Sequence, residues 1–243
     1  MANSNHNFFS LIIPCYNESL NIPKLFKQIY INQKKIRFET IVIDNGSTDN
    51  SLKIIKKYEK KIKDLKIIKI KKNIGFGHAI KKGILKSKHS LICYTHGDLQ
   101  VDIKSCLKAH SIYKKQLNKN ILVKGRRLGR TYIDIFFTIV MGWINSILFR
   151  TYLFDIHAQP NFFRKMSTQV IKKAPNDMSI DLFFYIYFKM RKAEILRFNI
   201  IFEKRIYGLG NNIGIKKITN SLVSLVNSIK ILKNIYCCYK FNG

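Results

Sequence analysis

Short apolar runs alternate with longer amphipathic stretches through the first half of the chain. The runs are rich in Ile, Leu and Val, which is typical of strands that are buried on both faces. We expect strands at 8–13, 39–43, 65–70, 91–94 and 121–123. The stretches between them have apolar residues three and four positions apart, and they predict helices at 22–31, 51–62, 79–87 and 103–113. Strict alternation predicts right-handed crossovers, and therefore an α/β doubly wound, mostly parallel sheet with flanking helices.

A long apolar stretch from 133 to 149 opens the second half of the chain. Its polar or small positions fall on one face of a helix: Asp134, Thr138, Gly142 and Asn145. We interpret it as an amphipathic helix rather than a membrane span, because a span needs about 20 mostly apolar residues.

The rest of the second half predicts fewer regular elements. A Pro-containing segment at 155–164, a helix near 179–190 and a strand at 194–202 follow. Between 216 and 233, aliphatic residues line one face of a further amphipathic helix: Ile218, Leu222, Leu225, Val226, Ile229 and Leu232. We expect one domain over 1–212 and an amphipathic C-terminal helix and tail over 213–243, which either packs on the domain or binds a membrane surface.

Composition adds a strong positive charge to this picture. The chain is 47% hydrophobic, enough for a substantial core, and its formal net charge is +30. That surplus favours a polyanionic partner, such as nucleic acid, an anionic membrane surface or a phosphorylated substrate. The alternative is a solvated Lys-rich surface without a specific partner. Nucleic-acid binding is the less favoured hypothesis, because no recognised binding motif is present and the aromatic residues fall mainly in apolar runs.

The cysteines and the N-terminus bear on the cellular compartment. The five Cys have no metal-ligand spacing, and Cys15 and Cys93 lie in or beside apolar runs, as buried small hydrophobic residues do. No signal-peptide pattern precedes the first apolar run. We therefore expect a reducing, cytoplasmic compartment.

The few acidic residues gather where apolar runs end. The chain has 14 Asp and Glu, and Glu18, Asp44, Asp98 and Asp155 each follow such a run. In an open α/β sheet, ligands bind at the carboxyl ends of the strands. These carboxylates predict a site that holds a cation, or the hydrogen-bond donors of a substrate, inside a basic protein.

The turns after the strands indicate which chemistry this site performs. The first turn reads Pro-Cys-Tyr-Asn-Glu-Ser from 14 to 19, so a glycine-rich dinucleotide loop is absent. Asp44 begins a run of turn and cap residues, but a cap does not use its carboxylate, which is placed to accept hydrogen bonds from a nucleobase or ribose. His96, Asp98 and Gln100 offer ligands to a divalent ion that bridges a diphosphate. For each of them alone, a satisfied polar turn is the alternative.

Five motifs occur in order along the first half: Ile-Ile-Pro-Cys-Tyr-Asn-Glu (12–18), Asp-Asn-Gly-Ser-Thr-Asp (44–49), Asn-Ile-Gly-Phe-Gly-His-Ala (73–79), His-Gly-Asp-Leu-Gln (96–100) and Lys-Gly-Arg-Arg (124–127). With this order and spacing, the chain resembles a family 2 glycosyltransferase over roughly residues 8–210. The resemblance is to the branch that includes dolichyl-phosphate mannose synthase and bacterial cell-surface polysaccharide enzymes.

The resemblance implies a GT-A fold, a nucleotide-diphosphate sugar as donor, Mg²⁺ or Mn²⁺ as cofactor, and transfer with inversion at the anomeric carbon. It divides the domain into a nucleotide-sugar half at about 8–125 and an acceptor half at about 126–212. The donor-binding residues that it implies are Pro14, Tyr16, Glu18, Asp44, Asn73, Gly75 and Gly77.

The resemblance also assigns the metal and phosphate contacts. Asp98 would bind the metal, with His96 and Gln100 beside it, and Arg126 and Arg205 would face phosphates. The family's metal motif usually has Asp where this chain has His96. Imidazole suits Mn²⁺ better than Mg²⁺, so this departure leaves the identity of the metal open.

We expect a cytoplasmic glycosyltransferase, peripheral at the inner face of the membrane, that uses a lipid-linked (polyprenyl phosphate) or cell-envelope glycan acceptor. A phosphate acceptor needs no general base, whereas a sugar hydroxyl does, and Asp155 or Asp181 is then the candidate. The cluster of arginines after 125 favours a lipid phosphate. The alternatives are a nucleic-acid-binding protein and a catalytically degenerate family member, the latter prompted by His96.

Overall fold

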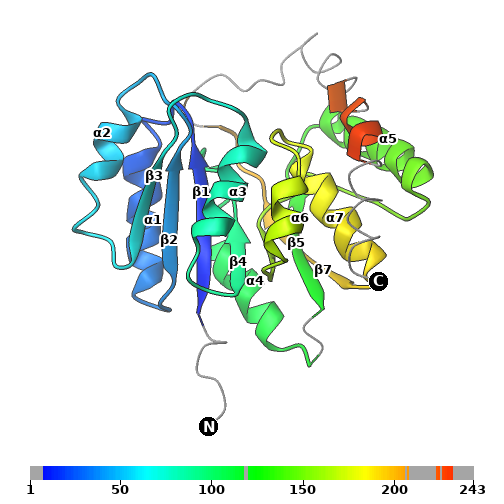
Figure 1. Cartoon of the computed structure of the whole chain (residues 1–243), viewed down its shortest axis with the longest axis horizontal. Coiled ribbons are helices and arrows are strands. Elements are labelled where there is room, and N and C mark those ends of the chain that lie inside the picture. Colours follow the sequence, from blue (N-terminus) through cyan, green and yellow to red (C-terminus); the bar gives the residue numbers. More distant parts are fainter. Residues whose placement is uncertain (1–7, 118–119, 206, 208–222, 225, 232–243) are drawn as a thin grey trace.

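The protein folds around one seven-stranded sheet with the order β3-β2-β1-β4-β6-β5-β7 (Figure 1). This computed structural model describes residues 8–117, 120–205, 207, 223–224 and 226–231. The strands are β1 (Phe9–Cys15), β2 (Glu39–Asp44), β3 (Leu65–Lys69), β4 (Leu91–Tyr94), β5 (Ile121–Leu128), β6 (Asn161–Arg164) and β7 (Glu194–Ile201). The helices are α1 (Ile22–Gln33), α2 (Ser51–Lys56), α3 (Phe76–Lys86), α4 (Lys104–Lys114), α5 (Tyr132–Phe149), α6 (Thr168–Lys173) and α7 (Ile180–Met190). All pairings are parallel except those of β6, which is antiparallel to β4 and β5.

The predicted α/β class and the alternation of strand and helix in the first half are confirmed. Every expected strand and helix of that half is present, and α2 differs most because it ends at Lys56. The sequence pattern did not predict β6 and α6. β6 has four residues and directly follows Pro160, and α6 has six residues, so neither is long enough to show a period.

Two apolar cores lie on opposite faces of the sheet. Successive side chains of β1 point to opposite faces of the sheet. Ile12 lies in the core that α3, α6 and α7 cover, whereas Leu11 and Ile13 lie in the core that α1, α2 and α4 cover. The residues that α1 buries include Ile22, Leu25, Phe26 and Ile29. Each such side chain contributes about 1.5–3 kcal/mol when it is fully buried. This packing fixes the strand ends that carry the site.

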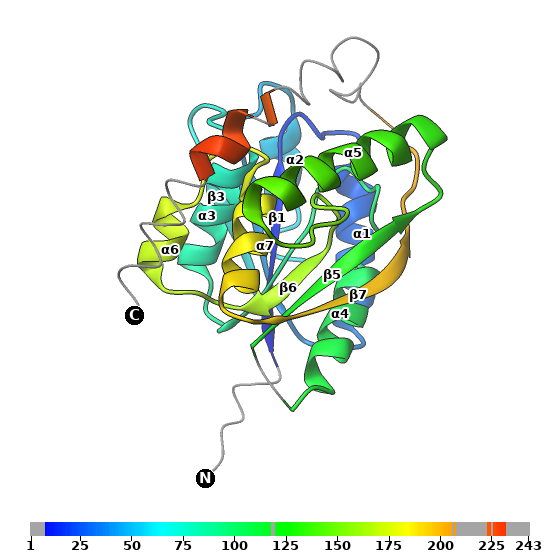
Figure 2. The same ribbon diagram turned by 90° about the vertical axis from the view of Figure 1, so that its right-hand side faces the viewer.

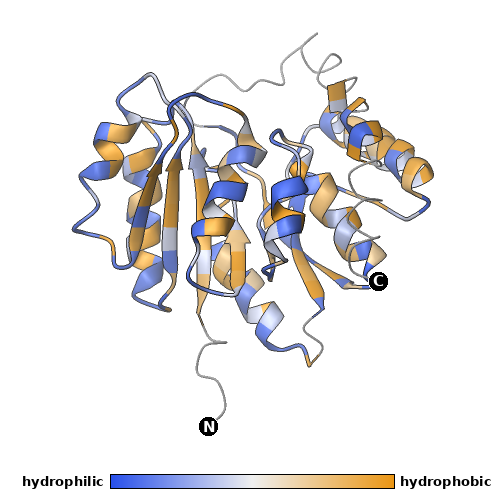
Figure 3. Ribbon diagram, viewed as in Figure 1, coloured by the Kyte–Doolittle hydropathy of each residue, from blue (hydrophilic) through white to orange (hydrophobic). Residues whose placement is uncertain are grey.

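Helix α5 turns its polar face to the protein and its apolar face outward (Figure 3). Its buried residues are Gly142 and Asn145, and a Cβ added at Gly142 would lie only 2.9 Å from the Leu153 carbonyl oxygen. Its exposed apolar side chains are Tyr132, Ile133, Ile135, Phe136, Ile139, Trp143, Ile144 and Ile147. The amphipathic helix is therefore present. A surface helix of a globular domain turns its apolar face toward the core, whereas α5 turns its apolar face outward.

Length and composition also allow α5 to cross a membrane. The helix has 18 residues, which at 1.5 Å each span about 27 Å, close to the thickness of a bilayer core. Only 11% of the residues from Tyr132 to Phe149 are buried inside the protein. From its sequence we interpret this segment as an amphipathic helix rather than a span, and length and composition alone do not decide between a helix that lies on a membrane and one that crosses it.

The described part of the C-terminal tail packs on the domain. Ser228 and Ile231 are buried, and the Asn227 side-chain amide donates a hydrogen bond to Asp177 over 3.2 Å. Val226 and Ile229 of the expected apolar face are more than half exposed, at 53% and 55%. Figures 1 and 2 show this segment near α5. The other residues expected on that face, Ile218, Leu222, Leu225 and Leu232, lie outside the described residues.

Candidate active site

The loops after β1 and β2 are joined by hydrogen bonds at the carboxyl edge of the sheet. The backbone amide of Glu18 donates to the Ser51 hydroxyl over 2.9 Å, and that of Ser19 donates to Asp49 over 3.1 Å. The polar residues after Asp44 therefore connect two loops, in addition to turning the chain into α2. Asp44 is buried and accepts from the backbone amide of Ser47 over 3.3 Å. One of its oxygens remains for further hydrogen bonds.

Asp98 lies at the same edge, four residues beyond the end of β4, and pairs with an arginine from the far end of the domain. The Arg205 guanidinium donates to Asp98 Oδ2 over 2.9 Å, and its distance to Glu18 Oε1 is 3.9 Å. Burial, together with the charges of Asp98 and Asp49, raises the pKa of Glu18. The structure thus brings Glu18, Asp98 and Arg205, which are distant in sequence, into one charged cluster.

The residues around Asp98 fit a divalent cation that takes most of its ligands from a substrate. Leu99 has a positive φ of 64°, and this turn lets the Gln100 amide donate to Asp98 Oδ1 over 3.2 Å. Burial lowers the pKa of His96 despite the opposing charges of Asp98 and Asp181, which leaves a neutral imidazole with a lone pair. Within the described residues, no group of three or more His, Cys, Asp or Glu forms a metal site. Such a sparse donor set leaves coordination positions for phosphate and water.

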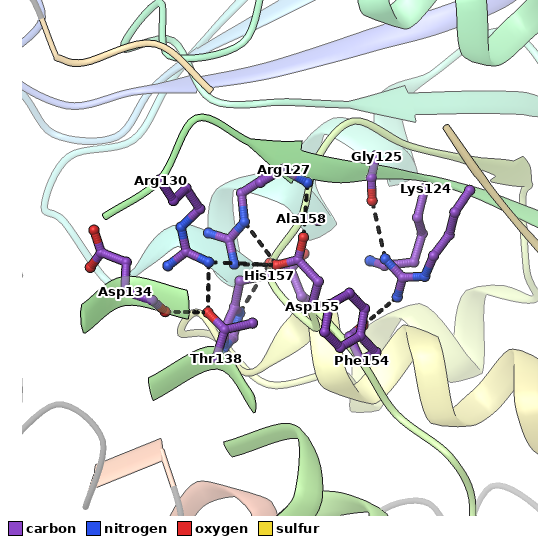
Figure 4. A network of polar contacts seen from close by, with 12 residues as sticks. Lys124, Gly125, Arg127, Arg130, Asp134, Thr138, Phe154, Asp155, His157 and Ala158 are labelled. Atoms are coloured by element: carbon purple, nitrogen blue, oxygen red, sulfur yellow. Dashed lines mark hydrogen bonds and ion pairs between the residues drawn. The ribbon is translucent and has the colours of Figure 1, made fainter. Parts of the chain in front are cut away.

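A second polar cluster links β5, α5 and the loop before β6 (Figure 4). The Asp155 carboxylate accepts from the Arg127 backbone amide over 3.0 Å and from its guanidinium, with Nε at 2.8 Å. Arg130 lies 4.0 Å from the same carboxylate and donates to the Thr138 hydroxyl of α5 over 2.6 Å. Although burial alone would raise the pKa of Asp155, the charge and hydrogen bonds of Arg127 lower it. Asp155 is ionised and fully engaged.

A third cluster lies under the site and centres on Asp181, at the start of α7. Its side chain is 0% exposed and accepts from the Tyr94 hydroxyl over 2.6 Å. His157 Nδ1 lies 3.3 Å from the other oxygen. Lys124 is also fully buried, donates to Asn161, and has a pKa lowered to about 7 by burial. Burial works against ionisation of Asp181, but His157 and Lys124 lower its pKa overall.

Residues 10–136 match the profile of glycosyl transferase family 2. The chain belongs to this family. That match covers the motifs after β1, β2 and β4, which confirms the resemblance drawn from them.

Two relatives of this family 2 chain act on lipid phosphates by name. A dolichyl-phosphate beta-glucosyltransferase of Dictyostelium discoideum is 31% identical over 124 residues, 47% of this chain and 38% of the relative. A dodecaprenyl-phosphate galacturonate synthase of Rhizobium johnstonii is 33% identical over 98 residues, 39% of this chain and 29% of the relative. The chain thus spans well under two thirds of the length of these relatives.

Solved structures of two glycosyltransferases have the same fold as this family 2 chain. Glucosyl-3-phosphoglycerate synthase from Mycobacterium tuberculosis, bound to Mn²⁺, UDP and glucosyl-3-phosphoglycerate, superposes with a TM-score of 0.65 at 12% identity, over 91% of this chain and 80% of that one. A mannosyltransferase from Pyrobaculum calidifontis, bound to GDP-Man and Mn²⁺, gives 0.57 at 15% identity, over 83% and 58%. These similarities confirm the expected GT-A fold.

The predicted donor-binding residues of this family 2 chain lie in different surroundings. Tyr16 is exposed, whereas Asp44 is buried at the strand end, and Asn73 accepts a hydrogen bond from Asn45 over 3.1 Å. Gly75 and Gly77 are required for packing, because a Cβ at either would lie 2.4 Å from a carbonyl oxygen of the 175–177 loop. Their assignment to donor binding stays a prediction, and so do those of Pro14 and Glu18.

The structure also separates the arginines that the sequence placed together. Arg126, predicted to face a phosphate, has an exposed side chain, and its neighbour Arg127 meets Asp155. Neither His157 nor Lys124 was among the predicted site residues. Lys124 lies two residues after Leu122 in β5, so strand alternation would have placed it on a buried face. No comparable signal marks His157, because its contact with Asp181 joins the loop before β6 to α7.

Proposed function

We propose that this chain transfers a sugar from a nucleotide-diphosphate donor to a lipid-linked acceptor, a polyprenyl phosphate, with inversion at the anomeric carbon. The observation that carries the proposal is the convergence of Asp44, Asp98 and Arg205 at the carboxyl edge of a GT-A sheet. The names of the relatives support a lipid phosphate as acceptor. The Mn²⁺ and the UDP or GDP-Man bound in the two solved structures support a divalent metal and a nucleotide-sugar donor.

In this mechanism, each residue acts on a different part of the donor. Asp44 accepts hydrogen bonds from the nucleobase or ribose. Asp98, with His96 and Gln100 beside it, would hold Mg²⁺ or Mn²⁺, which supplies charge that stabilises the leaving diphosphate. Arg205, now paired with Asp98, is positioned to move its guanidinium to a phosphate oxygen. The acceptor oxygen attacks the anomeric carbon from the side opposite to the bond that joins it to the leaving nucleoside diphosphate.

Donor binding can be tested without an acceptor. A thermal-shift screen of nucleoside diphosphates and their sugars, with and without Mn²⁺, should reveal at least one nucleotide that raises the melting temperature only with the metal. The absence of a shift with every nucleotide would support a degenerate family member. Salt-sensitive binding to DNA together with no nucleotide response would favour nucleic-acid binding.

We further infer that α5 places the enzyme on the membrane that contains the acceptor. Its outward apolar side chains include Phe136, Trp143 and Ile147, which are 63%, 70% and 73% exposed. A cavity of about 610 Å³ lies where the end of α5 meets residues 150–154, and its lining includes Trp143, Ile147 and Arg150. The net charge of +30 suits an anionic, cytoplasmic leaflet.

Changing Phe136, Trp143 and Ile147 together to Ser should lower binding to anionic vesicles at least a hundredfold. Each apolar side chain contributes about 1.5–3 kcal/mol on burial, and the substitutions leave the charge attraction unchanged. Vesicle co-sedimentation at that salt measures the change. The matched control changes Tyr30, Ile31 and Leu117 to Ser, since these exposed side chains belong to α1 and to the segment after α4. Equal losses in the two triple variants would contradict the assignment of α5.

A further inference from the structure

The pair formed by His157 and Asp181 has a feature that the donor site does not require. The side chain of Asp181, one of the two candidate bases, has no exposed surface. His157 covers it, and 35% of the histidine side chain is exposed. The exposed member of the pair is therefore the imidazole, with one ring nitrogen directed to Asp181 and the other available for a ligand.

The surroundings of Asp181 keep it both ionised and fixed. The Tyr94 hydroxyl donates to Oδ1 over 2.6 Å, and the Asn161 amide lies 3.5 Å from the same oxygen. Hydrogen bonding and charge from His157, together with the charge of Lys124, lower the pKa of Asp181 against the effect of burial. A carboxylate held in this way fixes the orientation of the His157 ring, because one ring nitrogen lies against Asp181 Oδ2. The pair can thus present the second ring nitrogen at the surface of the site.

The neighbouring arginines are largely committed to other partners. The side chains of Arg127 and Arg130 are only 12% and 13% exposed, and both lie against Asp155. Close to His157, the Gln159 side chain is buried, and neither its nitrogen nor its oxygen has a partner within the described structure. A buried amide without a partner is uncommon and indicates a bound water or ligand group.

The position of His157 connects the lipid surface with the donor site. The loop that carries it begins at the end of α5, the apolar helix, and reaches Asp155 and then His157 (Figure 4). Asp181 in turn lies near enough to His96 to influence its titration. A lipid phosphate whose chain lies along α5 would therefore bring its head group to His157, next to the motif that contains Asp98.

We propose that His157, held by Asp181, binds the phosphate of the acceptor lipid through its free ring nitrogen. This inference rests on the proposed function, since it requires a phosphate on the acceptor. Asp181 is then a positioning residue that never touches the substrate. A charge-assisted hydrogen bond of this kind is strong enough to change the affinity for a phosphate about tenfold or more.

Farnesyl phosphate and farnesol are suitable probes, because they share the isoprenoid chain and differ in the phosphate. In calorimetric titrations, the wild type should bind farnesyl phosphate at least tenfold more tightly than farnesol. His157→Gln should lose this preference while its affinity for farnesol stays unchanged. His157→Lys should retain much of it, since a lysine ammonium also donates to a phosphate. Asp181→Asn should weaken farnesyl phosphate binding, and the double variant should lose no more than His157→Gln.

The matched control is His89→Gln, because His89 precedes β4 at the opposite end of the strand from Asp98. If His157→Gln binds farnesyl phosphate like the wild type, the inference is overturned. It is also overturned if His157→Lys fails to transfer sugar while added imidazole restores His157→Gln, since that result identifies a general base and a hydroxyl acceptor. The wild type could also bind the two probes equally well and still bind nucleotide and Mn²⁺. That result would contradict a phosphate acceptor but not the proposed donor site.

Discussion

Replacing Asp98 with Asn should lower sugar transfer by about 10²–10³-fold while the fold persists. Asp98 is the only carboxylate in the 96–100 motif, and within the described residues no cluster of ligands could replace it. Asn keeps the size of the side chain and removes the charge that holds the cation against the diphosphate. Steady-state transfer with saturating Mn²⁺ measures the loss, and the melting temperature of the variant reports on the fold.

The control for this prediction is Asp102→Asn in the same loop. Asp102 accepts a hydrogen bond from the Lys104 backbone amide over 2.7 Å, and Asn can accept it equally well. Its transfer rate should match that of the wild type. Full activity of Asp98→Asn, or of the wild type in excess chelator, would remove the metal from the mechanism. His96→Asp should shift the preference from Mn²⁺ toward Mg²⁺.

The second large effect concerns stability at alkaline pH and arises from Lys124. Burial lowers its pKa to about 7 in the folded protein, whereas an unfolded lysine titrates near pH 10.4. Between these values the unfolded chain binds more protons, so this group makes the free energy of unfolding increase with pH. The slope approaches roughly 1.4 kcal/mol per pH unit, and the total is on the order of 4 kcal/mol. Below pH 7 both states are protonated, and the contribution is constant.

Urea unfolding of the wild type and of Lys124→Met from pH 6 to pH 10 isolates this effect. Methionine fills the same space without a titrating group, so the difference in unfolding free energy between the two proteins should change in favour of the wild type as the pH rises. Subtraction removes the contributions of other groups, such as the surface lysines. A difference that is independent of pH would show that burial does not lower the pKa of Lys124 in the folded protein.

The first half of the fold follows from the sequence because its strands lie inside a parallel sheet. Strands covered on both faces, such as β1 and β2, are continuous apolar runs, and the helices between them show a clear period. β6 has no such signature, since its four residues pair antiparallel with two strands that are distant in sequence. The periodicity of α5 predicts a helix but not which of its faces meets the protein.

The site could be predicted only where it depends on strand ends. Asp44 and Asp98 follow apolar runs, and the topology of the sheet brings such positions to one edge. Contacts of loop residues with distant strands and helices carry no such signal. The loop before β6 brings Asp155 to Arg127 of β5 and His157 to Asp181 of α7. For this reason the sequence predicts Asp155 and Asp181 as candidate bases without indicating that the first pairs with Arg127 and the second lies against His157.

The most direct test of the account is a transfer assay with purified protein, Mn²⁺, a panel of nucleotide-diphosphate sugars labelled in the sugar, and vesicles that contain polyprenyl phosphate. Label recovered in the organic phase measures transfer to the lipid. The account predicts that at least one donor labels the lipid, that release of nucleoside diphosphate matches it, and that Asp98→Asn and chelator each lower the transfer rate about a hundredfold or more. Transfer by Asp98→Asn at the wild-type rate, or no labelled lipid from any donor despite metal-dependent nucleotide binding, would contradict it.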